Sequence, residues 1–150
     1  MEAPRVGAAP TSLVQTGAVI SVDLARSLRT AGVRWEPHNG DWFVVDAAEL
    51  LDQRLVLSDI TVDVHATRAG TILGFNGTTE WALDSVGVED TLWLPLEHQL
   101  RELLGDSFDR LDRVDGSWRV VLTVDGAPIS FSDPECAEAY GRAVLHVRTR

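Results

Sequence analysis

One stretch near the end of the sequence decides the fold class, because in it two apolar runs flank a tight turn. It reads Trp118-Arg119-Val120-Val121-Leu122-Thr123-Val124-Asp125-Gly126-Ala127-Pro128-Ile129-Ser130-Phe131. An Asp-Gly pair between two apolar runs is the strongest short-range signal for a β-hairpin. The stretch therefore predicts two antiparallel strands, Trp118 to Val124 and Ala127 to Phe131.

A second hairpin is predicted further upstream. Ile60, Val62 and Val64 alternate with Thr61, Asp63 and His65, as expected of a half-buried strand. A turn at Thr67–Gly70 would return the chain as a second strand, Thr71–Phe75. A short strand is predicted at Trp42–Val45, and Leu55–Leu57 is expected to be extended.

Three helices are predicted from apolar spacing and end signals. The first runs from Val22 to Ala31, with Ser21 as its cap. The second runs from Pro95 to Leu104, with Pro95 at its first position and Gly105 at its end. The third is capped by Asp133 with Pro134 at its first position, and one apolar face contains Cys136, Tyr140, Ala143, Val144 and Val147. The acidic segment Asp106–Asp115 is expected to be a solvated loop.

These elements predict an α+β fold, an antiparallel sheet built from hairpins with about three helices packed on one face. The length of 150 residues suits one domain. We expect a flexible N-terminal tail over residues 1–19 and a single α+β domain over residues 20–150.

Composition limits the classes of function. The net charge of −10 argues against binding to nucleic acid and to anionic membranes, since both require clustered basic residues. Cys136 is the one cysteine, which excludes an intramolecular disulfide. No apolar run approaches the roughly 20 residues of a membrane span. A cytoplasmic location is expected.

Two sets of polar residues could form a site. Asp63 and His65 lie two residues apart on one strand and could ligate a metal or act in acid–base chemistry, with Asp59 and Glu80 joining them in space. The alternative, which we favour, is a solvated strand face. Similarly, Glu36, His38 and Asp41 could bind a cation, but ordinary turn chemistry explains the Asn39-Gly40-Asp41 sequence. We therefore expect no metal site and no catalytic residue.

The segment from Phe75 to Trp81 is the candidate binding loop, because it mixes aromatic and small polar residues. The binding residues expected there are Asn76, Thr78, Thr79, Glu80 and Trp81, with Asp63 and His65 added from the neighbouring strand. The alternative is a glycine turn with Trp81 packed inward.

Cys136 is expected in the first turn of the last helix, where the helix dipole can lower the pKa of a thiol. A catalytic cysteine also needs a base, and the sequence identifies none. We expect Cys136 to be a small core residue on the apolar helix face.

Several segments together resemble a group of small actinobacterial proteins labelled "pilus assembly protein CpaE". They are Val33–Pro37, Gly40–Phe43, Gly74–Val86, Leu92–Pro95 and Gln99–Gly105. The resemblance extends from about Ile20 to the C-terminus and implies an association with pilus assembly. The pilus assembly protein proper contains an ATPase domain whose phosphate loop needs lysine. This chain has no lysine, so no nucleotide and no other cofactor are expected.

The leading hypothesis is a non-enzymatic cytoplasmic accessory or protein-interaction domain with an unidentified protein partner. Whether the chain forms a homodimer stays open. The alternative is a small enzyme or ligand-binding domain that uses a cleft formed by Asp63, His65 and Glu80. A third hypothesis is an immunity-like or inhibitor protein whose acidic face meets a basic partner.

Overall fold

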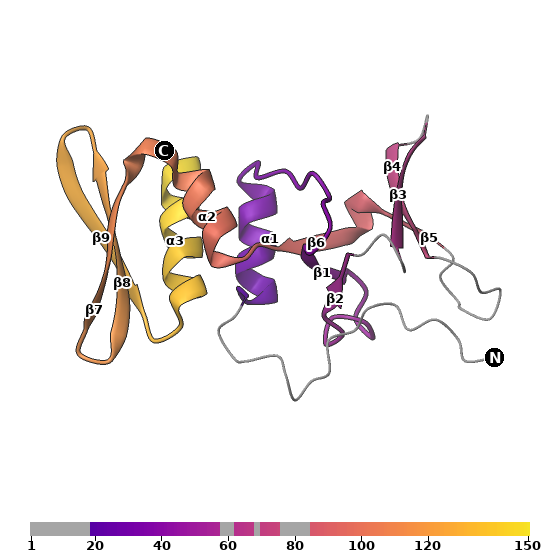
Figure 1. Ribbon diagram of the computed structural model, residues 1–150, viewed down its shortest axis with the longest axis horizontal. Coiled ribbons are helices and arrows are strands. Elements are labelled where there is room, and N and C mark those ends of the chain that lie inside the picture. Colours follow the sequence, from indigo (N-terminus) through magenta and orange to yellow (C-terminus); the bar gives the residue numbers. More distant parts are fainter. Residues whose placement is uncertain (1–18, 58–61, 68–69, 76–84) are drawn as a thin grey trace. The chain divides into compact units, whose positions relative to one another are not determined.

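The computed structural model describes residues 19–57, 62–67, 70–75 and 85–150 (Figure 1). Their helices are α1 (Val22–Thr30), α2 (Glu97–Leu104) and α3 (Cys136–Arg148), with short 3₁₀ turns η1 (Val88–Asp90) and η2 (Gly105–Ser107). Their strands are β1 (Trp42–Val45), β2 (Leu55–Val56), β3 (Val62–Thr67), β4 (Gly70–Phe75), β5 (Ser85–Gly87), β6 (Thr91–Leu94), β7 (Phe108–Val114), β8 (Ser117–Val124) and β9 (Ala127–Asp133). The predicted α+β class is confirmed.

Within this described part, the strands form three antiparallel sheets of three strands each, in the orders β2-β1-β6, β3-β4-β5 and β7-β8-β9. Contacts group the described residues into two compact units. One is formed within Trp35–Leu94. The other, which we call the helical unit, consists of residues 19–34 and Pro95–Arg150. The expectations of a single domain and of an N-terminal tail stay predictions, and residues 1–18 lie outside the described part.

Two tight turns organise the sheet of the helical unit. The predicted turn at Asp125-Gly126 joins β8 to β9, and both residues have positive φ, 51° and 77°. A second Asp-Gly turn, at Asp115 and Gly116, joins β7 to β8 with φ of 52° and 79°. Positive φ at both central residues is the signature of a type I′ turn, whose twist matches that of the flanking strands.

The three helices form layers beside this sheet. Helix α3 packs against β8 and β9, and α2 and α1 pack against α3 (Figure 1). The core at these contacts is dominated by fully buried residues of β8 and α3, including Val120, Leu122, Ala137, Tyr140 and Ala143. At Gly141 of α3, helix α1 is so close that a Cβ added to this glycine would lie 2.5 Å from Cδ2 of Leu24.

The first turn of α1 is held by side chains, as predicted for Ser21. The Ser21 hydroxyl accepts a hydrogen bond from the Leu24 backbone N–H at 3.2 Å. The Ser21 backbone N–H donates to the Glu138 carboxylate on α3. This pair of contacts fixes the start of α1 against the start of α3.

Three predictions about element boundaries are wrong. Phe108–Val114 is the strand β7, not part of a solvated loop, because its apolar positions Phe108 and Leu111 pair with Leu122 and Val120. Helix α2 begins at Glu97, after Pro95, with the Leu96 N–H bonded to Gln99 Oε1 at 2.9 Å. Helix α3 begins at Cys136, after Pro134.

Asp133 ends β9 and does not serve as the N-cap of α3, a position that Glu135 occupies. Its carboxylate still accepts a hydrogen bond from the Glu135 N–H, at 2.8 Å, and pairs with Arg142 of α3. The Asp133 side chain therefore accepts a hydrogen bond at the start of the helix, as expected of a capping aspartate. Asp133 itself, however, lies two residues before the N-cap Glu135.

The unit within Trp35–Leu94 has a small apolar core around β1 and β2. Phe43, Val45, Leu55 and Leu57 are buried there, and Trp35, Ala47, Leu50 and Val88 pack against them. The strand β1 pairs with β6 from Trp42–Leu94 to Val45–Thr91. In the second sheet of this unit, β3 pairs with β4 as the predicted hairpin.

Candidate functional site

The structure places only part of the predicted binding site. Asp63 and His65 lie on β3, where they are in register with Gly74 and Ile72 of β4. Asn76, Thr78, Thr79, Glu80 and Trp81 lie outside the described residues, as does Asp59. A cleft formed by Asp63, His65 and Glu80 therefore stays a prediction.

Asp41 belongs to the second candidate set, Glu36, His38 and Asp41, and it stabilises the turn in which it lies. Its side chain is buried, and Oδ2 accepts hydrogen bonds from Trp35 Nε1 at 2.8 Å and from the His38 backbone N–H at 2.9 Å. A buried carboxylate is stable only when such donors replace its water. The bonds hold Trp35 in place, and the Trp35 ring lies 5.3 Å from that of Phe43.

The neighbouring polar groups complete the same turn. His38 Nδ1 lies 2.6 Å from the Glu36 carbonyl oxygen, and the backbones of Gly40 and Asp41 bond to Leu57 at 2.8 Å each. Among the residues that the structure describes, no group of three or more His, Cys, Asp or Glu side chains could hold a metal ion. The bonds of the Glu36–Asp41 segment are those of a turn.

Cys136 is buried on α3, as predicted for a small core residue. Burial, together with the nearby carboxylate of Glu97, raises the pKa of its thiol to about 12. The thiolate is the reactive form of cysteine, so a thiol with this pKa is a poor nucleophile at neutral pH.

Tyr140 lies one turn further along α3 and belongs to the same contact with α2. Burial raises the pKa of its phenol, and Arg101 opposes this shift. The Tyr140 ring is 5.8 Å from that of Phe108, and the guanidinium of Arg101 lies 6.0 Å from the Phe108 ring centre. These contacts tie α2, α3 and β7 together.

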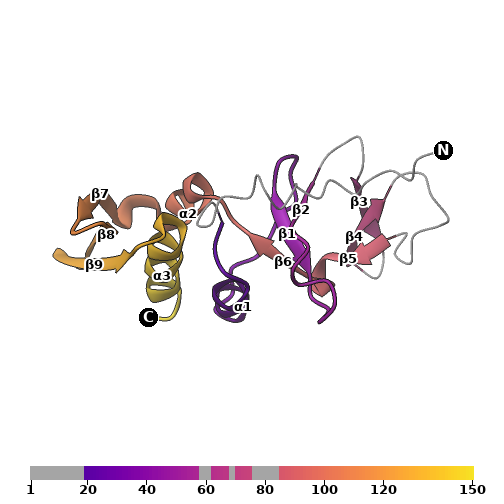
Figure 2. The same cartoon turned by 90° about the horizontal axis from the view of Figure 1, so that it is seen from below.

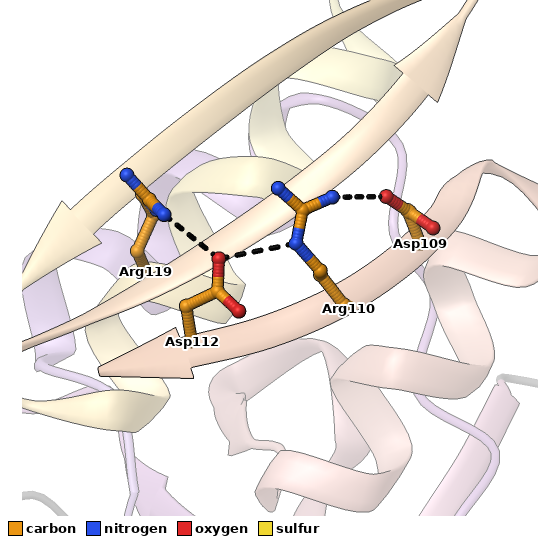
Figure 3. A network of polar contacts seen from close by, with 4 residues as sticks. All are labelled: Asp109, Arg110, Asp112 and Arg119. Atoms are coloured by element: carbon orange, nitrogen blue, oxygen red, sulfur yellow. Dashed lines mark hydrogen bonds and ion pairs between the residues drawn. The ribbon is translucent and has the colours of Figure 1, made fainter. Parts of the chain in front are cut away.

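A network of ion pairs lies across β7 and β8 (Figure 3). Asp112 Oδ2 accepts hydrogen bonds from Arg119 Nη2 at 2.8 Å and from Arg110 Nε at 3.1 Å, and Arg110 Nη1 donates to Asp109 at 2.6 Å. The bond from Arg119 is the main reason that the pKa of Asp112 lies below its usual range. The bond to Asp109 in turn raises the pKa of Arg110.

Sequence reasoning missed this network because it assigned Asp109 and Asp112 to a loop. The signal that could have revealed it is the second Asp-Gly pair, Asp115-Gly116, which predicts a hairpin between β7 and β8. In that register Asp112 lies opposite Arg119. Cross-strand pairs of opposite charge stabilise a sheet modestly.

Comparison with known proteins gives no relative for this chain. No protein-family model, no curated protein and no solved structure matches it. Within the described part of the chain, every helix is too short or too polar to span a bilayer.

Proposed function

We propose that this protein is a non-enzymatic accessory protein that binds a basic surface of another protein through its segment Trp35–Leu94. The observation behind the proposal is the distribution of charge. Trp35–Leu94 contains eleven acidic residues and two arginines, a formal charge of −9, whereas Val14–Arg34 and Pro95–Arg150 together contain eleven acidic residues and ten arginines. Almost all of the net charge of −10 therefore belongs to one unit.

Much of this charge is available at the surface. Within the described part of Trp35–Leu94, Glu36, Glu49, Asp52, Glu89 and Asp90 are exposed. Clustered charge of one sign speeds the association with an oppositely charged partner and disfavours partners of like charge. The expected partner is therefore a protein with a basic surface, in line with the hypothesis of an immunity-like or inhibitor protein.

The bonding of the buried titratable groups supports a non-enzymatic role. Asp41 is bonded to Trp35 and His38, and Cys136 and Tyr140 have raised pKa values within the contact between α2 and α3. Asp41 thus has a structural role, and the thiol and the phenol are held in their neutral, unreactive forms at neutral pH. An association with pilus assembly belongs to the same proposal and is supported only by the resemblance of the segments between Val33 and Gly105.

The experiment is affinity capture from the native host at low and high salt, with two double variants of equal charge change. Glu49→Arg with Asp52→Arg alters exposed residues of the acidic unit. Glu102→Arg with Asp106→Arg alters exposed residues of the helical unit. We expect a basic protein that is retained by the wild type, released by salt, lost from the first double variant and kept by the second.

Two results would overturn the proposal. The captured protein could be acidic, or both double variants could lose it equally, which would indicate an effect of total charge and not of the acidic unit. Retention that does not change with salt would also contradict binding through opposite charges.

A further inference from the structure

The two edges of the sheet β7-β8-β9 differ in how they are protected from other strands. The edge strand β7 contains Asp109, Arg110, Asp112 and Arg113, and its register with β8 shifts between Phe108 and Arg110. Charges and bulges both oppose pairing with a further strand. The edge strand β9 (Figure 2) has no charged residue from Ala127 to Ser132, its register with β8 is unbroken, and no described strand pairs with its outer side.

The hairpin register determines which backbone groups of β9 face outward. Val124 and Ala127 flank the two-residue turn, so they form a hydrogen-bonded pair, and bonded and non-bonded pairs then alternate along the ladder. The non-bonded residues of β9 are therefore Pro128, Ser130 and Ser132, whose backbone groups point away from β8.

Two observations agree with this assignment. Pro128 has no N–H to donate, and it stands at a position where an N–H would face away from β8. The Ser132 carbonyl oxygen accepts a hydrogen bond from Arg142 Nη2 at 2.8 Å, so it is directed away from Arg119, its neighbour on β8. Pro128, Ser130 and Ser132 are all exposed.

We propose that β9 pairs with β9 of a second copy of this chain, antiparallel about a two-fold axis at Ser130. The pairing would make one six-stranded sheet from two three-stranded sheets. At the axis, the two copies of Ser130 exchange two backbone hydrogen bonds. On each side of it, the Ser132 N–H donates to the Pro128 carbonyl of the other copy, which adds two more.

This register leaves no outward group of Pro128, Ser130 or Ser132 without a partner. The one bond missing on each side would join the N–H of Pro128 to the carbonyl of Ser132. Pro128 has no such N–H, and Arg142 of the same copy already occupies that carbonyl. An axis at Pro128 would lack both donors, and an axis at Ser132 would need carbonyls that are already bonded. Among axes at the three outward-facing residues, Ser130 is therefore the one that leaves no backbone group without a partner.

The side chains suit the same register. Ile129 of one copy lies opposite Phe131 of the other, and both residues are half-buried in the single chain. Cross-strand pairs of aromatic and β-branched residues are among the favourable ones. Ser130 faces Ser130, so no like charges meet at the axis. The inference concerns the helical unit alone, and it can fail or hold independently of the proposed binding of a basic protein.

The test is the molar mass of the full chain in solution, measured by light scattering over a series of concentrations. We expect the wild type to shift from monomer to dimer as concentration rises. Ser130→Pro removes the N–H at the axis and leaves the ladder with β8 intact, so it should weaken dimerisation at least about tenfold. Ser130→Thr keeps that N–H and should dimerise like the wild type.

A second variant and a second measurement distinguish loss of the dimer from loss of the fold. Ser130→Asp places two carboxylates at the axis and should give a monomer whose far-ultraviolet circular dichroism matches the wild type. In the wild type, the amides of Ser130 and Ser132 should exchange more slowly with deuterium as concentration rises. A wild type that stays monomeric up to about 1 mM, or a Ser130→Pro variant that dimerises unchanged, would overturn the proposal.

Discussion

The guanidinium of Arg142 on α3 donates a hydrogen bond to the carbonyl oxygen of Ser132 on β9, 2.8 Å away, and also pairs with the carboxylate of Asp133. One side chain thus binds the end of the edge strand to the helix that covers the sheet. Since β9 runs directly into α3, this contact sets the angle at which the chain leaves the sheet.

Replacing Arg142 should loosen this junction. Arg142→Met keeps much of the aliphatic stem but removes both polar contacts, and because the side chain is partly exposed we expect a loss of roughly 1 kcal/mol or less in the free energy of unfolding. Urea unfolding measures it. Arg148→Met, an exposed position on the same helix, serves as the control and should unfold like the wild type. Equal losses in the two variants would contradict the role assigned to Arg142.

The contact between α1 and α3 depends on Gly141. Gly141→Val should destabilise the protein by about 1–3 kcal/mol, because an added Cβ would lie 2.5 Å from Leu24 and 3.2 Å from Ile20. Thermal unfolding provides the measurement. The double variant Gly141→Val with Leu24→Ala makes room for the new side chain. It should be more stable than the sum of the two single changes predicts, whereas simple additivity would argue against the contact.

Asp41 should be essential to the stability of the turn before β1. Asp41→Ala removes the acceptor of two hydrogen bonds, one from the ring N–H of the half-buried Trp35 and one from the backbone N–H of His38, at a cost of about 1–3 kcal/mol in unfolding free energy. Chemical unfolding followed by tryptophan fluorescence reports it. Asp52→Ala, at an exposed turn position of the same unit, is the matched control. A stable Asp41→Ala variant would show that the carboxylate has no structural role.

Cys136 makes stability depend on pH in the alkaline range. Its thiol has a pKa of about 12 in the folded chain, against a usual value of 9.0. The unfolded thiol therefore ionises first, and its share of the stability is complete below pH 9.0 and is lost as pH rises toward about 12. Unfolding in urea at pH 7 and pH 10 tests this effect, and Cys136→Ala should reduce the difference, whereas the share that comes from the raised pKa of Tyr140 should persist. A thiol that reacts rapidly with a disulfide reagent at neutral pH in the folded protein would contradict the raised pKa.

How much of the fold the sequence predicts depends on how local its signals are. The Asp125-Gly126 turn and the Ser21 cap act within a few residues, and both are confirmed. The β7–β8 hairpin has an equally local signal in Asp115-Gly116, but the charges of Asp109 and Asp112 hid the strand. Asp112 pairs with Arg110 along β7 and with Arg119 across to β8. These pairs can be recognised only once the register of the two strands is known.

The candidate site was less predictable than the fold. The role of Asp41 depends on its bonds to Trp35 and to Leu57. The carboxylate is buried because distant parts of the chain pack around it, which the spacing of residues in the sequence does not reveal. The raised pKa of Cys136 likewise depends on burial in the folded chain and on Glu97, which lies on a different helix. Whether Asp63 and His65 meet Glu80 stays a prediction, since Glu80 lies outside the described residues.

The position of α1 has a consequence for the order in which the protein can fold during synthesis. Helix α1 packs against α3, yet Trp35–Leu94 lies between α1 and the rest of the helical unit in the chain. On the ribosome, α1 emerges long before the surface that covers Leu24 and Leu28 exists. Bringing distant segments together costs loop-closure entropy, which slows folding. Chains halted before Cys136 should therefore expose that apolar face and become targets for chaperones and proteases.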